Sequence, residues 1–372
     1  MPRSPHLLRI LAPAVLVALV GGACSSSKSS SSSTTAASSA TTAAPGSTAA
    51  PTTAAAKVSG TLNGSGSTFQ LAYDQAAIQA FQQANSGATI NYQGKGSGAG
   101  QTDLANQVVD FAGSDVAASS STTFKGGSLL YFPFVLGPIT VSYNLSGHTG
   151  IKLSGETIAK IFALKITNWN DPAIAADGNS GLPNQAITVV HRSDSSGTTA
   201  NFTAYLNAAD KTDWTLGTGK TVNWASNTVA GNGNNGVATA IKGKAGAIGY
   251  VDYSDAKAAG LSWAMVKNAA GNFVDATLDG ASASAGDATV KDDLTYNPIN
   301  QSGAQDYPIT SPTYIITYAK YSDAGKVALL KAFLHFILGT DGQNLAKTVD
   351  FAPISSSLDQ KATAQIDQIT TG

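Results

Sequence analysis

Cysteine, methionine, histidine and charge are scarce in this chain of 372 residues, which has one cysteine, two methionines, four histidines and 12% charged residues. A single cysteine excludes an intrachain disulfide and a cysteine-rich zinc or iron–sulfur site. The histidines, at positions 6, 148, 191 and 335, lack the close spacing of metal ligands, so no metal site is expected. The net charge of −1 excludes the broad basic surface that nucleic acid or anionic lipid would require.

Glycine and apolar residues are abundant instead, with 38 glycines and 42% hydrophobic residues. A chain of this length usually forms more than one domain, and the apolar content is sufficient for two cores.

The N-terminus has the pattern of an export signal. Two arginines precede an apolar run at residues 10–20, which is too short to span a bilayer, and small residues follow at 21–23. Segment 1–23 is therefore predicted to be a signal peptide. The only cysteine, Cys24, comes next and resembles the lipid-attachment cysteine of bacterial lipoproteins, which carries palmitate, although those proteins prefer Leu or Val at the position of Gly21. The alternative is an ordinary signal peptidase site with an incidental thiol.

Residues 24–57 are predicted to be a disordered tether. Residues 25–56 are almost entirely Ser, Thr, Ala and Pro, and such a stretch cannot bury enough apolar area to offset its conformational entropy. As a coil it would span about 30 Å. We expect it to separate a lipid anchor, on the extracytoplasmic face of the cell membrane, from a domain that begins near Val58. A Ser/Thr stalk without an anchor is the alternative.

From Val58 onward, short apolar runs alternate with helical patterns, which predicts an α/β fold with parallel sheets and ligands at the carboxyl ends of the strands. The expected helices are 69–84, 101–109, a segment after Ser154, 199–209, 254–259 and one carrying an apolar stripe from Val327 to Ile337; the expected strands are 88–93, 109–112, 186–190, 247–251 and 314–318.

Two glycine-rich loops lie between an expected strand and an expected helix. In loop 64–69, the Ser67 and Thr68 hydroxyls and the free N–H groups suit an anion at a helix N-terminus, although a flexible turn with an ordinary cap has the same pattern. Loop 94–100 fits the dinucleotide fingerprint G-x-G-x-x-A, and Asp115 follows the next strand where a ribose-binding acid is expected. A dinucleotide-dependent enzyme is therefore a second hypothesis.

A third loop, at residues 191–198, combines the guanidinium of Arg192, the carboxylate of Asp194 and several hydroxyls at a helix start. The alternative is a surface ion pair with a capping serine. A nearby Gly219-Lys220-Thr221 sequence resembles the end of a Walker A loop, but Trp214 stands where its first glycine belongs. No G-x-S-x-G elbow is present, which disfavours a serine hydrolase.

Taken in order, several long segments resemble the phosphate-binding lipoproteins of bacterial high-affinity phosphate ABC importers, the PstS type. They are GSGSTF, NYQGKGSGAG, VDFAGSD, ITNWNDPAI, ITVVHRSDSSGTTANF, GNGNNGV, GAIGYVDY and YPITSPTYIIT. The resemblance implies phosphate binding by Thr68, Phe69, Ser97, Asp115, Arg192, Ser196, Gly197 and Thr198, with Asp194 and Ser67 in support. The sequence departs from the family beside the site, at Lys95 and Ser195.

Asp115 carries the chemical argument for phosphate. An ionised carboxylate only accepts hydrogen bonds, so it repels an anion unless the anion brings a proton. Phosphate keeps at least one proton near neutral pH and sulfate keeps none. Sites that demand a donor reject analogues without one by roughly 10⁴-fold or more.

The resemblance implies a two-lobed type II periplasmic-binding-protein (Venus flytrap) fold with two crossover strands as a hinge. Lobe I would comprise residues 58–138 plus 306–372, and lobe II residues 139–305. We therefore expect a monomer without cofactor or catalysis that captures inorganic phosphate and delivers it to the transmembrane permease subunits of an ABC importer. The alternatives are a binder of another oxyanion such as sulfate, the dinucleotide-dependent enzyme, and a surface adhesin.

Overall fold

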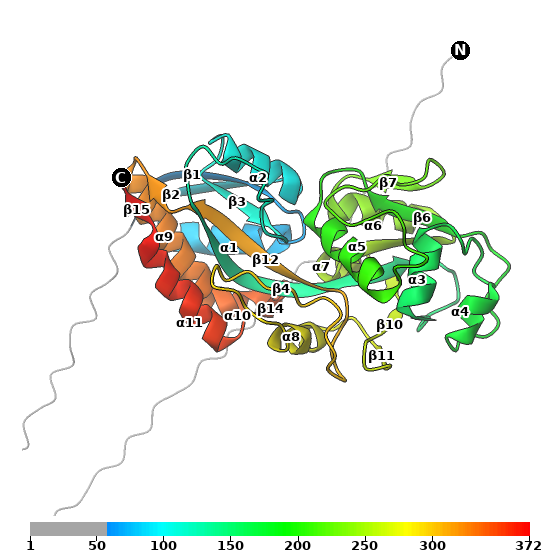
Figure 1. The fold of residues 1–372 in the computed structure, drawn as a ribbon. Coiled ribbons are helices and arrows are strands. Elements are labelled where there is room, and N and C mark those ends of the chain that lie inside the picture. Colours follow the sequence, from blue (N-terminus) through cyan, green and yellow to red (C-terminus); the bar gives the residue numbers. More distant parts are fainter. Residues whose placement is uncertain (1–57) are drawn as a thin grey trace, which may run out of the picture. The chain divides into compact units, whose positions relative to one another are not determined.

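The computed structural model describes residues 58–372, whose helices and strands are drawn in Figure 1. The predicted signal peptide, Cys24 and the tether lie outside the described residues. Within the described part of the chain, no helix is long and apolar enough to cross a membrane.

A mixed sheet organises these residues, with the strand order β2-β1-β3-β12-β4-β8-β6-β7. Its outer pairs, β1 with β2 and β3, and β6 with β7 and β8, are parallel as expected. The expectation of parallel sheets is wrong at the centre, because β12 and β4 run antiparallel to their neighbours. The strands are β1 (Ser59–Gly66), β2 (Gly87–Gly94), β3 (Phe111–Ser114), β4 (Leu129–Tyr143), β6 (Thr188–Arg192), β7 (Val229–Gly231), β8 (Ala247–Asp252) and β12 (Thr310–Tyr318).

Strand β4 connects two halves of this sheet (Figure 1). It pairs with β12 as far as Pro138 and with β8 from Ile139 onward. We call β2, β1, β3, β12 and residues 129–138, with the loops and helices that follow these strands, the first half-sheet. Residues 139–143, β8, β6 and β7, with the loops and helices that follow them, are the second. The chain returns from the second half-sheet to the first just before β12, where the Tyr307 hydroxyl donates to the Ile139 carbonyl over 2.9 Å. These two connections confirm the expected crossover architecture.

Helices follow the strands and cover the sheet. They are α1 (Leu71–Ala84), α2 (Ser97–Ala105), α3 (Gly155–Phe162), α4 (Pro172–Ala176), α5 (Gly197–Ala209), α6 (Gly233–Gly243), α7 (Tyr253–Ala258), α8 (Leu278–Gly286), α9 (Ala324–Leu338), α10 (Thr340–Thr348), α11 (Ser356–Gln365) and the 3₁₀ turn η1 (Ile366–Gln368). Short strands complete the fold: β5 (Lys152–Leu153), β9 (Ser262–Trp263), β10 (Met265–Lys267), β11 (Phe273–Val274), β13 (Lys320–Tyr321), β14 (Ala352–Pro353) and β15 (Thr370–Thr371).

Two helices that follow glycine-rich loops begin at residues other than those predicted. Helix α1 begins at Leu71 rather than at residue 69, and neither Ser67 nor Thr68 caps it, because its N-cap is Gln70, whose side chain makes no capping hydrogen bond. Helix α2 begins at Ser97 rather than at residue 101, so half of the second loop is the first turn of a helix. Glycine has a low helix propensity, which hid this start in the sequence.

The core lies on both faces of the sheet. Two predictions from the sequence are confirmed here. The apolar stripe on α9 is buried from Val327 to Ile337, and Ser154 caps α3 by accepting from the Thr157 N–H. A smaller core, which includes Val190, Val237 and Val251, lies between β6, β8 and α6. Packing on both faces fixes the strand ends from which the polar loops project.

Candidate anion-binding site

The N-termini of α1, α2, α5 and α6 meet at the carboxyl ends of β1, β2, β6 and β7. Loops of the two half-sheets touch there, since the Gly98 N–H donates to the Ser195 carbonyl over 2.9 Å. The first N–H groups of a helix have no partner within the helix, and its dipole is positive at that end. Four such ends at one place form an environment that favours an anion.

The first loop is held in place by a hydrogen bond within the loop, by aromatic packing and by a close approach of its backbone to β3. The Ser67 hydroxyl accepts from the Phe69 N–H over 2.9 Å, and the buried Phe69 ring packs edge-on against Phe351. Gly66 adopts a φ of +148°, and a Cβ there would lie 2.0 Å from the Gly113 carbonyl oxygen. Only glycine allows this approach, which turns Thr68 toward the second half-sheet.

Asp115 follows β3 and is almost completely buried, with 1% of its surface exposed. The Ser97 hydroxyl accepts from the Asp115 N–H over 3.2 Å and donates to Oδ2 over 3.3 Å. The other oxygen, Oδ1, has no hydrogen-bond partner among the described residues. Burial raises the pKa of Asp115 to about 6, while the neighbouring hydroxyls of Ser67, Ser97 and Thr198 and the charge of Arg192 oppose that rise. Oδ1 is therefore a buried acceptor that lacks a donor.

Arg192 supplies the cation of the site. Its Nε and Nη2 donate to the two carboxylate oxygens of Asp194 over 2.8 and 2.5 Å, and its Nη1 donates to Thr198 Oγ1 over 3.3 Å. Burial raises the pKa of Asp194, but the hydrogen bonds and charge of Arg192 outweigh this and hold the pKa below its usual range. The ion pair fixes the guanidinium and neutralises part of its charge.

The start of α5 completes the arrangement. Ser196 caps the helix by accepting from the Thr199 N–H over 3.1 Å, and Thr198 is fully buried. A Cβ on Gly197 would lie 2.4 Å from Ser97 Oγ and 2.6 Å from Asp115 Oδ2. The absence of a side chain at this glycine lets the second half-sheet reach the carboxylate of the first.

The structure thus brings together all ten residues that the sequence predicts around the anion: Ser67, Thr68, Phe69, Ser97, Asp115, Arg192, Asp194, Ser196, Gly197 and Thr198. Of the two departures from the family pattern, Lys95 pairs with Asp103 over 3.1 Å, and Ser195 offers its carbonyl to Gly98.

Sequence reasoning missed two asparagines that join the loops. Asn234 Nδ2 donates to the hydroxyls of Thr68, over 3.1 Å, and Thr198, over 3.2 Å. Asn201 Nδ2 donates to the Asp115 carbonyl over 3.0 Å. Asn234 had a usable signal, since it lies in the segment GNGNNGV, a fourth glycine-rich loop before a helix. Asn201 lies inside α5 and had none.

The second loop leaves little room for a dinucleotide. A Cβ on Gly96 would lie 2.3 Å from Asp194 Oδ2, and one on Gly98 would lie 2.0 Å from Ser195 Oγ. The third loop of this chain, residues 191–198, therefore packs directly against these two glycines and occupies the space that a dinucleotide would need. Asp115 is buried beside Arg192, whereas a ribose-binding acid must reach a sugar at the rim.

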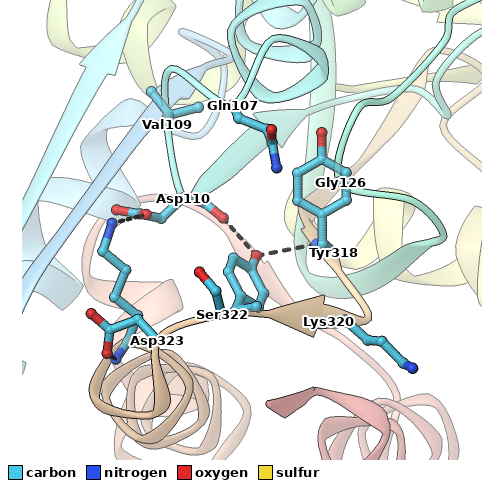
Figure 2. Close-up of a pocket in the computed structure, with 10 residues that line it drawn as sticks. Gln107, Val109, Asp110, Gly126, Tyr318, Lys320, Ser322 and Asp323 are labelled. Carbon is cyan, nitrogen blue, oxygen red and sulfur yellow. Dashed lines mark hydrogen bonds and ion pairs between the residues drawn. The ribbon is translucent and has the colours of Figure 1, made fainter. Parts of the chain in front are cut away.

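A separate pocket of about 420 Å³ lies in the first half-sheet, between β3 and β13 (Figure 2). Asp110 and Lys326 form an ion pair of 2.6 Å at its wall, and the Tyr321 hydroxyl donates to the Asp110 carbonyl over 2.6 Å. None of the ten residues that are predicted to surround an anion lines this pocket. The ion pair satisfies Asp110 and Lys326, and Lys320 also lines the pocket, but no carboxylate oxygen there is buried without a partner as Asp115 Oδ1 is.

Comparisons with known proteins agree with this geometry. The family model of the PBP superfamily domain matches residues 51–341. Phosphate-binding protein PstS 3 of Mycobacterium tuberculosis is 36% identical over 325 residues, which cover 83% of this chain and 86% of that protein. Phosphate-binding protein PstS of Pasteurella multocida is 36% identical over 314 residues, which cover 82% of this chain and 89% of that protein.

Solved structures show the same fold. The high-affinity periplasmic phosphate-binding protein PfluDING, bound with phosphate, aligns with a TM-score of 0.66 and 27% identity over 82% of this chain and 93% of that one. The phosphate-binding protein of Stenotrophomonas maltophilia, at 21% identity, aligns with a TM-score of 0.64 over 82% and 94% of the two chains. The chain therefore belongs to the PBP superfamily and, within it, to the PstS family of phosphate-binding proteins, with their two-lobed α/β fold.

Proposed function

We propose that this protein captures inorganic phosphate between its two half-sheets and delivers it, unchanged, to the transmembrane permease subunits of an ABC importer. The observation that carries the proposal is the buried Oδ1 of Asp115, an acceptor without a donor at a place where four helix N-termini and Arg192 attract an anion. A protonated oxyanion satisfies both features at once. Its oxygens accept from the N–H groups and the guanidinium, and its proton goes to Asp115.

Phosphate suits these groups better than sulfate does. Phosphate carries one or two protons between pH 5 and 8, whereas sulfate carries none and would leave the carboxylate unpaired against a dianion. The ligand-binding residues are proposed to be Thr68, Phe69, Ser97, Asp115, Arg192, Ser196, Gly197 and Thr198. No cofactor and no chemical step are needed for this role.

The proposed lobes are residues 58–138 plus 306–372 and residues 139–305. The change of partner strand in β4 between Pro138 and Ile139 supports the first boundary. The hydrogen bond from Tyr307 to Ile139 supports a return near residue 306. Because Asp115 lies on the first lobe and Arg192 on the second, closure of the lobes would assemble the site.

The chain is further proposed to act as a monomer on the extracytoplasmic face of the cell membrane, held by a lipid on Cys24 after removal of residues 1–23. The signal-like N-terminus and the single cysteine support this location. Mass spectrometry of the mature N-terminus tests it, and an unmodified terminus at any other residue would overturn it.

Calorimetry of the wild-type protein with phosphate and with sulfate at pH 7.5 tests the binding function. We expect phosphate to bind more tightly by roughly 10⁴-fold. Equal affinity for the two anions would overturn the assignment to phosphate. If NAD raises the melting temperature and neither anion does, the dinucleotide enzyme is favoured. If none of the three ligands changes the melting temperature, the adhesin is favoured.

A further inference from the structure

Lys220 reaches from the second half-sheet to the first. It lies in the loop between α5 and β7, and its Nζ donates to the Oε1 of Gln101 on α2. Among the described residues, no carboxylate lies within ion-pair distance of Lys220. The amide of Gln101 is therefore the group that receives this ammonium.

Both ends of the contact are attached to the anion site. The Lys220 carbonyl accepts from the N–H of Ser196, the cap of α5, over 2.9 Å. On the other side, Gln101 Nε2 donates to Ser114 Oγ over 2.9 Å and to the Val116 carbonyl over 3.0 Å. Ser114 and Val116 flank Asp115 in the sequence. Through its backbone and its side chain, Lys220 thus connects the start of α5 to the strand end that carries Asp115.

No carboxylate of the described segment, residues 58–372, neutralises the charge of Lys220. Burial lowers its pKa, which shows that the surroundings penalise the ammonium. Arg192 is already paired with Asp194, and Gln101 is the group that holds the Lys220 ammonium. The contact exists only while the two half-sheets lie close together.

We propose that Lys220 and Gln101 form a clasp that holds the two lobes closed on the bound anion and slows its release. This inference deepens the proposed function and rests on it. Opening must separate the two side chains, because one belongs to each half-sheet. Lys220 is a positioning residue here, since it acts through Gln101 and the α5 cap and the structure gives it no place among the proposed ligand-binding groups.

The chain provides a matched control in a second lysine that joins the halves. Lys257 on α7 pairs with Asp350, after α10, over 2.6 Å, but their side chains are 53% and 30% exposed. Exposed pairs of this kind contribute little to stability. Lys257→Met should therefore leave phosphate release unchanged within about twofold.

Stopped-flow fluorescence with phosphate tests the clasp. Lys220→Met should raise the dissociation rate about tenfold, the effect of a lost charge-assisted hydrogen bond, while the association rate changes less than threefold. Gln101→Leu should raise dissociation similarly, and the double variant should add little to either single one. Lys220→Arg keeps a charged donor and should release phosphate as slowly as the wild type. A fall in the association rate alone would overturn the clasp, because it means that Lys220 acts at a distance through its charge. Additive effects of the two substitutions would also overturn it, because they mean that the two side chains act independently.

Hydrogen exchange separates this inference from the proposed function. In the absence of anion, Lys220→Met should speed exchange at the first turns of α2 and α5, but not in α9, whereas a general loss of stability would speed all three. If the wild type does not bind phosphate, the proposed function fails, and the exchange result decides the clasp by itself. Unchanged exchange at α2 and α5 would overturn it.

Discussion

The Ser97 hydroxyl and Asp115 exchange two hydrogen bonds, one from the Asp115 N–H to Ser97 Oγ at 3.2 Å and one from Ser97 Oγ to Asp115 Oδ2 at 3.3 Å. The second oxygen of the same carboxylate has no partner among the described residues. This asymmetry orients Oδ1 as an acceptor, and a buried acceptor of this kind selects for ligands that carry a hydrogen.

Asp115→Asn should relax the choice between phosphate and sulfate. The amide can donate as well as accept, so sulfate gains a hydrogen bond where it previously met a charge. We expect the affinity ratio to fall from roughly 10⁴ to below about 10² by calorimetry at pH 7.5. Asp350→Asn, at an exposed ion pair, is the control and should keep the ratio. An unchanged ratio in Asp115→Asn would mean that selectivity resides elsewhere.

Gly197→Ala should abolish tight binding without unfolding the protein. Its Cβ would lie 2.4 Å from Ser97 Oγ and 2.6 Å from Asp115 Oδ2, so the two lobes could not approach. We expect a loss of phosphate affinity of over 100-fold, equivalent to about 3 kcal/mol, with a small change in melting temperature. Gly243→Ala is the control, because a Cβ there meets nothing within 4 Å. Normal binding by Gly197→Ala would show that closure does not require this contact.

Asn234→Ala should weaken binding by about tenfold. The side chain joins the half-buried Thr68 of the first half-sheet to the buried Thr198 of the second, at 3.1 and 3.2 Å, and its loss leaves both hydroxyls less well placed. The neighbouring Asn235 is exposed, and Asn235→Ala should bind phosphate like the wild type. Equal behaviour of the two variants in calorimetry would refute a linking role for Asn234.

The stability of the anion-free protein should fall between about pH 4 and pH 6. Burial raises the pKa of Asp115 from 3.8 to about 6, so in this interval the folded state holds a proton that the unfolded state has lost. Stability therefore decreases as pH rises, by up to about 3 kcal/mol for this one group. Urea unfolding at pH 4.5 and pH 7 measures it, with Asp115→Asn as the reference. The wild type should lose about 2 kcal/mol relative to that variant at the higher pH, and a parallel response of the two proteins would contradict the shift.

The strand–loop–helix units of the site were readable from the sequence. Each glycine-rich loop follows an apolar strand and precedes a helical pattern, and this local order places polar groups at strand ends. The burial of Asp115 was not readable in this way. It depends on β12 and α5, which are far away in the chain, and a carboxylate in a loop looks the same whether it is exposed or enclosed.

The sequence by itself determined the chemistry that is available: a guanidinium with its carboxylate in one loop, a lone acid after a strand, and free N–H groups before helices. Only the tertiary structure decided how these groups act together. The antiparallel course of β4, the link through Asn234 and the contact between Lys220 and Gln101 join residues that are more than a hundred positions apart. Local patterns report the conformation of a few consecutive residues, whereas desolvation and cross-lobe hydrogen bonds arise only once distant segments are packed together.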